Sequence, residues 1–98
     1  MVQRNLFFRL EPPRQTPEGR RDAVEELRAG LSAGPRLRGL TIGVPADAPS
    51  EKSWDLSVAL HFDDVQSASV FVADRQPFLD GWCASRAQVV KGWSFTAQ

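Results

Sequence analysis

Hydrophobic and polar positions alternate along residues 2–10 and again along residues 54–62. Period-two alternation is typical of a β-strand that buries one face. The hydrophobic positions are Val2, Leu6, Phe8, Leu10, Trp54, Leu56, Val58, Leu60 and Phe62. Less regular apolar runs predict two further strands at 37–44 and 88–96. The intervening segment 45–53, rich in Pro, Ala and Ser, is expected to be a mobile loop.

Two further segments carry helical signals. Thr16-Pro17-Glu18 has the N-cap, first-turn proline and acidic residue of a helix start, and Gly34-Pro35 ends that helix. Apolar residues recur between them at helical spacing: Ala23, Val24, Leu27 and Leu31. Asp63 is expected to cap a second helix, with Gln66 at the reciprocal position. Pro77 is expected to break it, leaving a short helix with Phe78, Leu79 and Trp82.

The resulting order, βαββαβ, is the split βαβ pattern. It predicts a ferredoxin-like α+β fold, in which a four-stranded antiparallel sheet carries both helices on one face, within a single domain of residues 1–98. The predicted core between sheet and helices comprises Val2, Leu6, Phe8, Leu27, Leu31, Leu56, Val58, Leu60, Phe71 and Val72.

The opposite sheet face is too mixed for a core and too apolar for open water. Its candidate interface residues are Asn5, Phe7, Ser57, Ala59 and His61. We expect a second copy of the chain to cover this face, which would make a homodimer with the form of a dimeric α+β barrel.

Composition narrows the function classes. Lysine plus arginine and aspartate plus glutamate both number 12, so the formal net charge is 0. A nucleic-acid binder usually carries a strong basic footprint, and none is expected here. Cys83 is the only cysteine and His61 the only histidine, which excludes an internal disulfide and predicts no structural metal site. The lone thiol is typical of a reduced, cytoplasmic setting, which we expect here. The first residues resemble neither a signal peptide nor a membrane span.

The chain resembles the stress-responsive α/β-barrel family, called Dabb, over nearly all 98 residues. The resemblance lies in a first strand ending Phe-Phe-Arg-Leu (7–10), a middle strand Trp-Asp-Leu-Ser-Val-Ala-Leu-His-Phe-Asp (54–63), the helix after it, and a closing aromatic strand around Trp93. It implies a dimeric barrel and identifies a fold better than an activity.

Polyketide cyclases of that family carry a histidine in strand 1, a tyrosine in the second helix and a His-Pro-x-His stretch. The matching positions here are Arg4, Phe71 and 74–77, which reads Asp-Arg-Gln-Pro. The cyclase acid–base groups are therefore absent. Asn5 and Trp82 match two residues of the related haem-degrading monooxygenases, but no histidine follows His61.

Four side chains are candidate ligand-binding residues: Arg4, Phe71, Asp74 and Trp82. By alternation Arg4 faces the helices, where a guanidinium needs a ligand anion or a carboxylate partner such as Asp74 or Asp80. His61 is the one side chain with an ordinary pKa near neutrality, and is expected to be a polar interface residue.

The sequence therefore favours a homodimer without clear catalytic machinery that binds a small apolar or anionic ligand between sheet and helices, with no cofactor. The alternative is a cofactor-independent enzyme of the polyketide cyclase or isomerase type. In that case Arg4 would stabilise charge, and His61 or Asp74 would act as the base.

Overall fold

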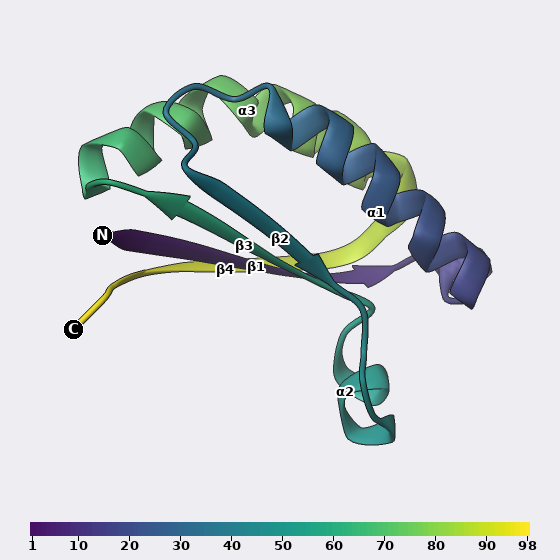
Figure 1. Cartoon of the computed structure of the whole chain (residues 1–98). Helices are drawn as coiled ribbons and strands as arrows, with labels where there is room; N and C mark the ends of the chain where they lie inside the picture. Colours follow the sequence, from purple (N-terminus) through teal and green to yellow (C-terminus); the bar gives the residue numbers. More distant parts are fainter.

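The computed structural model describes residues 1–98 (Figure 1). Along the chain it has β1 (Val2–Leu10), the 3₁₀ turn η1 (Pro12–Arg14), α1 (Pro17–Ser32), β2 (Gly39–Gly43), α2 (Ala48–Ser53), β3 (Leu56–Phe62), α3 (Val65–Arg86) and β4 (Ala87–Thr96). The strands form one sheet in the order β2-β3-β1-β4, and every neighbouring pair is antiparallel. Helices α1 and α3 cover one face of this sheet, and α2 lies on its other side. The predicted ferredoxin-like α+β fold is confirmed.

The core follows the alternation of the two central strands. Even-numbered residues of β1 and β3 are buried against the helices, with Arg4 as the half-buried exception. Phe8 is fully buried and meets Trp82 of α3 edge-on, with 5.6 Å between ring centroids. Burying one such side chain stabilises the fold by about 1.5–3 kcal/mol. Of the predicted core residues, all are buried except Val72, which is half-buried.

Helix α1 begins and packs as its sequence indicates. The Thr16 hydroxyl accepts a hydrogen bond from the backbone N–H of Gly19 at 3.0 Å, and Pro17 takes the first position. Gly30 and Gly34 let α3 approach closely: a Cβ there would lie 2.0 Å from the Phe78 ring and 2.1 Å from the Phe71 ring. Two glycines four residues apart therefore make room for two phenyl rings.

Helix α3 differs from its prediction at two points. Asp64, not Asp63, is the N-cap, and its carboxylate accepts from the N–H of Ser67 at 2.7 Å, which lowers the pKa of that carboxyl. Pro77 does not break the helix, which runs unbroken to Arg86. Ala73, whose carbonyl loses its N–H partner, is exposed, so water can bond this carbonyl.

The segment between β2 and β3 also differs from its prediction. It contains α2, capped by Asp47, whose carboxylate accepts from the N–H of Ser50 at 2.9 Å. Strand β3 starts only at Leu56, so the predicted alternation fails before it. Trp54 packs beside Phe7 of the open face, with ring centroids 5.8 Å apart, and Asp55 is buried instead.

Candidate functional site

A cavity of about 210 Å³ lies between α3 and strands β1, β3 and β4. Its apolar walls come from Leu6, Leu60, Phe71, Val72, Leu79 and Val90. Four polar side chains also line it: Arg4, Gln76, Asp80 and Cys83. A mostly apolar hollow with a few polar groups is the usual form of a small-molecule site.

Arg4 reaches the cavity from the middle of the sheet. Its neighbours across β3 and β4 are Leu60 and Ser94, and its guanidinium Nη1 donates to the Ser94 hydroxyl at 3.1 Å. A Cβ on Gly92 would lie 3.0 Å from Nη2 of Arg4 and 2.6 Å from the Leu6 side chain. Gly92 therefore gives Arg4 the space to lie across β4. No carboxylate pairs with this guanidinium, although Asp80 lines the same cavity.

The other polar lining comes from successive turns of α3. Gln76 donates to the Asp80 carboxylate at 2.7 Å, and Cys83 follows three residues later. Burial, together with the negative charge of Asp80, raises the pKa of the Cys83 thiol. The thiol therefore stays protonated at neutral pH and acts as a weakly polar wall, not as a nucleophile.

The structure separates the four predicted ligand-binding residues. Arg4 and Phe71 line the cavity. The Asp74 carboxylate accepts a hydrogen bond from Nε of Arg75 at 2.8 Å, and Asp74 does not line the cavity. Trp82 is buried, and its indole N–H donates to Glu26 of α1 at 3.0 Å. The role of these residues in ligand binding stays a prediction, and the cavity contacts favour Arg4 and Phe71 over the other two.

Several cavity residues escaped the sequence prediction, among them Gln76, Leu79 and Cys83 on α3. With Asp80, they occur at helical spacing i, i+3, i+4 and i+7. That spacing is the signal that could have identified a single lining face. The expected break at Pro77 hid it, because a broken helix would not keep these side chains in one row.

The five predicted interface residues all lie on the sheet face away from α1 and α3. In the register, Asn5 stands opposite Ala59, Phe7 opposite Ser57, and His61 opposite Gln3. His61 is thus on the far side of the sheet from the cavity and cannot act as a base in it. Whether these residues form an interface stays a prediction.

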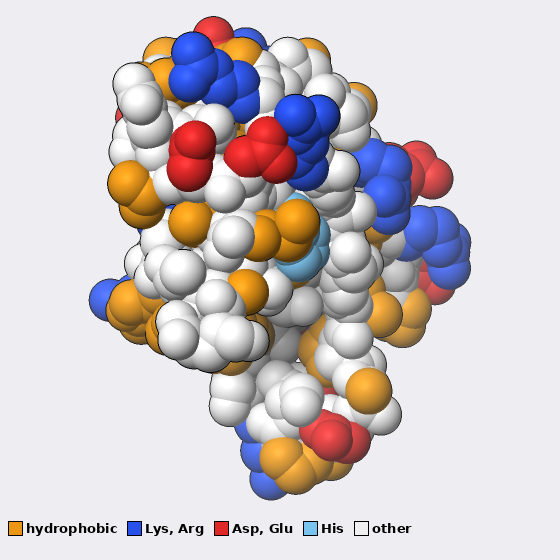
Figure 2. Space-filling view, turned by 60° about the vertical axis from the view of Figure 1, so that its left-hand side comes forward, with side chains coloured by type: hydrophobic (Ala, Val, Ile, Leu, Met, Phe, Trp, Pro, Cys, Tyr) orange, Lys and Arg blue, Asp and Glu red, His pale blue; other side chains and the backbone are white.

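This open face is more aromatic than predicted. Strand β4 presents Trp93 and Phe95 there, 49% and 59% exposed. The Phe7 ring lies between Trp54 and Trp93, at centroid distances of 5.8 and 6.1 Å. Figure 2, an oblique view, shows charged side chains over the helices and on the segment around α2, with fewer between them.

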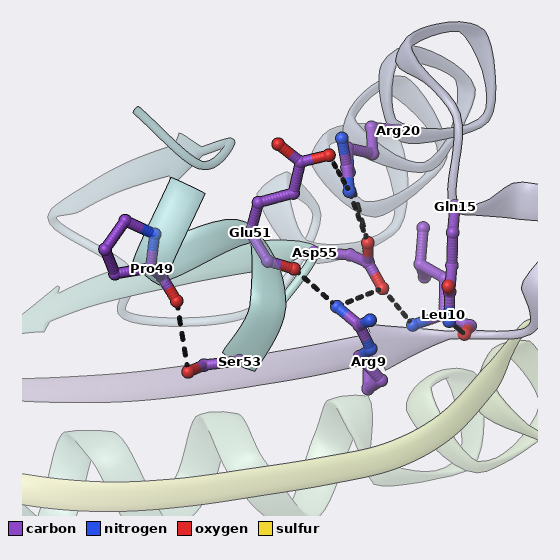
Figure 3. Close-up of polar contacts among 8 residues, drawn as sticks. All are labelled: Arg9, Leu10, Gln15, Arg20, Pro49, Glu51, Ser53 and Asp55. Atoms are coloured by element: carbon purple, nitrogen blue, oxygen red, sulfur yellow. Dashed lines mark hydrogen bonds and ion pairs between the residues drawn. The ribbon is translucent and has the colours of Figure 1, made fainter. Parts of the chain in front are cut away.

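Asp55 is a buried charge that the sequence analysis did not single out (Figure 3). Its Oδ1 accepts from Nε and Nη2 of Arg20 at 3.1 and 2.9 Å, and its Oδ2 accepts from the N–H of Leu10 at 2.8 Å. Arg9 lies 3.6 Å from the same carboxylate and donates to the carbonyl of Glu51 at 2.8 Å. These contacts join β1, α1, α2 and the start of β3, so the cluster is a structural junction.

No group of three or more His, Cys, Asp or Glu side chains is placed to hold a metal ion. None of the helices combines the length and the apolar character needed to cross a membrane.

Comparison with known proteins identifies the fold class. No family model matches the sequence, and no curated protein matches it. Among solved structures, a Dabb family protein with a ferredoxin-like fold from Mesorhizobium loti superposes with a TM-score of 0.78 at 12% identity, covering 99% of this chain and 96% of that one. The class is therefore the ferredoxin-like fold found in Dabb proteins, as the sequence pattern predicted.

Two further structures share this fold. A dimeric protein of unknown function with a ferredoxin-like fold from Bacteroides fragilis has a TM-score of 0.74 at 11% identity, over 98% of this chain and 95% of that one. The hydroxynitrile lyase of Passiflora edulis has a TM-score of 0.76 at 12% identity, over 99% and 93%. At such identities the shared property is the fold, and function has to be argued from the site.

Proposed function

We propose that the protein is a homodimer that binds a small ligand, with an anionic or carbonyl group, in the cavity between α3 and the sheet. The observation that carries this proposal is Arg4, a guanidinium at an apolar cavity with no carboxylate partner within ion-pair distance. Arginine hydrogen bonds to carboxylates are among the stronger ones in proteins, and apolar surroundings strengthen them.

The size and position of the cavity restrict the ligand. About 210 Å³ is below the usual range for drug-sized ligands, so the buried part of the ligand is small. A shallower hollow of about 390 Å³ adjoins it beyond Arg4, where α3 contributes Val65 and Ser69. Arg4 and Gln76 line both hollows, so an elongated ligand can place its polar group between them.

The homodimer is supported by the open face. Exposed aromatic side chains that cluster on one surface usually mark an interaction site. Here half-buried Phe7 and Trp54 and exposed Trp93 form such a cluster on the sheet face that α1 and α3 leave open. The Bacteroides fragilis protein with the same fold is described as dimeric, which supports the same assembly for this chain.

A cofactor-independent enzyme is the second candidate. One observation favours it: Asp80 brings a carboxylate into the same cavity as Arg4, so a base and a cation could act on one ligand. The two bases suggested by the sequence are less suitable. His61 lies on the opposite face of the sheet, and the Asp74 carboxylate is paired with Arg75. Release of cyanide from a hydroxynitrile, lost in Asp80→Asn, would favour this candidate.

Calorimetric titration with benzoate and with benzyl alcohol tests the ligand-binding proposal. In Arg4→Met the dissociation constant for benzoate should rise at least tenfold, because a charge-assisted hydrogen bond contributes about 1.5–3 kcal/mol. Benzyl alcohol should bind the variant and the wild type almost equally. Arg28→Met, at an exposed position of α1, is the matched control and should change neither value. Failure of the wild type to bind benzoate, or equal binding by Arg4→Met, would contradict the proposal.

A further inference from the structure

Two charged side chains of opposite sign line the cavity between α3 and the sheet. Arg4 comes from β1, and Asp80 comes from α3, which lies over the sheet (Figure 1). Neither forms an ion pair, with the other or with any further side chain. No other charged side chain lines the cavity. The site therefore offers one unpaired cation and one unpaired anion on facing walls.

We propose that the cavity binds an amino acid with an apolar side chain, whose carboxylate binds Arg4 and whose ammonium group binds Asp80. This inference rests on the proposed ligand-binding function and adds the class of ligand, a zwitterion in place of a simple anion. Such a ligand has no net charge, as the cavity lining has none, and it satisfies both unpaired groups at once.

Each charged group is held on its own wall before a ligand binds. Nη1 of Arg4 donates to the Ser94 hydroxyl at 3.1 Å, and Oδ1 of Asp80 accepts from Nε2 of Gln76 at 2.7 Å. Both groups keep free capacity, because a guanidinium has further N–H donors and a carboxylate has a second acceptor oxygen. Groups that are already positioned lose less conformational entropy when a ligand binds.

A simple anion fits this lining less well than a zwitterion. Its negative charge would satisfy Arg4 but would enter a cavity that already holds the Asp80 carboxylate. The negative charge of Asp80 acts inside the cavity, since burial and this charge together raise the pKa of the Cys83 thiol. Like charges at a binding site weaken binding, whereas an ammonium group makes the same carboxylate a partner. Asp80 therefore favours a ligand with a positive group.

The remaining walls favour an apolar side chain on the amino acid. Leu6, Leu60 and Phe71 offer no hydrogen-bonding side chain to a further polar group of the ligand. Each methylene group that they cover strengthens binding about fourfold. Gln76 and Asp80 are exposed, so the charged end of the amino acid lies at the mouth of the cavity and its side chain points inward.

Calorimetric titration of the wild type with matched compounds tests the ligand class. Leucine carries both charges, 4-methylpentanoate is leucine without its ammonium group, and leucinamide has a neutral amide in place of the carboxylate. Leucine should bind at least about fivefold more tightly than either analogue, the upper range for an ion pair at a partly exposed site. Glycine, with both charges and no apolar side chain, should bind at least about tenfold more weakly than leucine.

Variants of the two charged residues assign each ligand group to its partner. Asp80→Asn should remove the preference for leucine over 4-methylpentanoate, because it removes both the partner of the ammonium group and the repulsion of the carboxylate. Arg4→Met should weaken both of these compounds and leave leucinamide unchanged. Asp22→Asn, at an exposed position of α1, is the matched control and should change none of the dissociation constants. Circular dichroism checks that the variants fold.

The outcomes separate the ligand class from the proposed function. Equal binding of leucine and 4-methylpentanoate by the wild type would overturn the zwitterion and leave the anion-binding cavity standing. The same conclusion follows if Asp80→Asn keeps the preference for leucine, or if benzoate binds and leucine does not. If none of the carboxylates binds, benzoate included, both the zwitterion and the proposed function are overturned.

Discussion

At the scale of single residues, Asp55 shows how one charge can be withdrawn from water without being left unsatisfied. Its side chain is fully buried, and both carboxylate oxygens accept hydrogen bonds, one pair from Arg20 and one from the backbone of Leu10. The side chain of Arg20 is itself only 12% exposed. Removing one member of such a pair leaves the other buried without a counter-charge, which usually costs more than the intact pair contributes.

Asp55→Asn should therefore lower the free energy of unfolding by about 3 kcal/mol, as expected when a buried pair is broken. Urea unfolding measures this value. Asp74→Asn is the control, because Asp74 is paired with Arg75 at the surface, where such pairs contribute about 0–1 kcal/mol. Similar losses in both variants would show that the junction at Asp55 does not stabilise the fold.

Little in the sequence singles out Asp55 as a buried residue. Strict alternation placed it on the open face with Ser57, Ala59 and His61, because the pattern was continued back to Trp54. The strand begins two residues later, at Leu56, and its irregular start lets Asp55 turn inward toward Arg20. The basic partners come from β1 and α1, so no local spacing could have paired them with this carboxylate.

At the scale of elements, the contact between α1 and α3 depends on glycine. The Phe78 ring lies over Gly30, and the Phe71 ring lies over Gly34. Helix propensity alone favours alanine over glycine inside a helix by about 1 kcal/mol. Packing and propensity therefore act in opposite directions at Gly30, which makes a comparison with an unpacked glycine informative.

Gly30→Ala should destabilise the protein by about 1–3 kcal/mol, the usual cost of overpacking, because a Cβ there would lie 2.0 Å from the Phe78 ring. Gly81→Ala should instead stabilise it by up to about 1 kcal/mol, since a Cβ at Gly81 meets nothing within 4 Å. Thermal unfolding of the two variants gives the comparison. A gain in stability from Gly30→Ala would contradict the close helix contact.

The elements themselves were largely predictable. Strands β1 and β3 alternate because one face of each is buried, and α1 has a clear cap and apolar stripe. Helix α3 was harder to predict. The rule that proline breaks helices considers only the local backbone and takes no account of tertiary packing. Here Phe71, Phe78 and Trp82 pack on both sides of Pro77, and their burial holds one continuous helix. The cavity residues on α3 could not be grouped without that continuity.

At the scale of the whole molecule, the open face decides whether the chain acts alone. Phe7 lies at its centre, between Trp54 and Trp93. Phe7→Glu should convert the dimer to a monomer at micromolar concentration, because it would replace an aromatic side chain at the centre of the proposed interface by a charge that has to be desolvated, although Lys91 stands opposite it in the register. Light scattering measures the mass of the wild type and the variant. Arg21→Glu, an exposed change on α1, is the control and should remain dimeric. A wild-type monomer would contradict the expected assembly.

The strand order has a kinetic consequence. Strand β1 lies inside the sheet, so its residue Val2 pairs with Phe62 on one side and with Thr96 on the other. The chain must therefore close very long loops before its central strand gains hydrogen bonds, and such topologies fold slowly compared with helical bundles. During that interval β4 is an unpaired apolar strand without proline and with one charge, the kind of segment that seeds aggregation. The protein should therefore refold with the highest yield from dilute solution, even though the proposed assembly needs two copies.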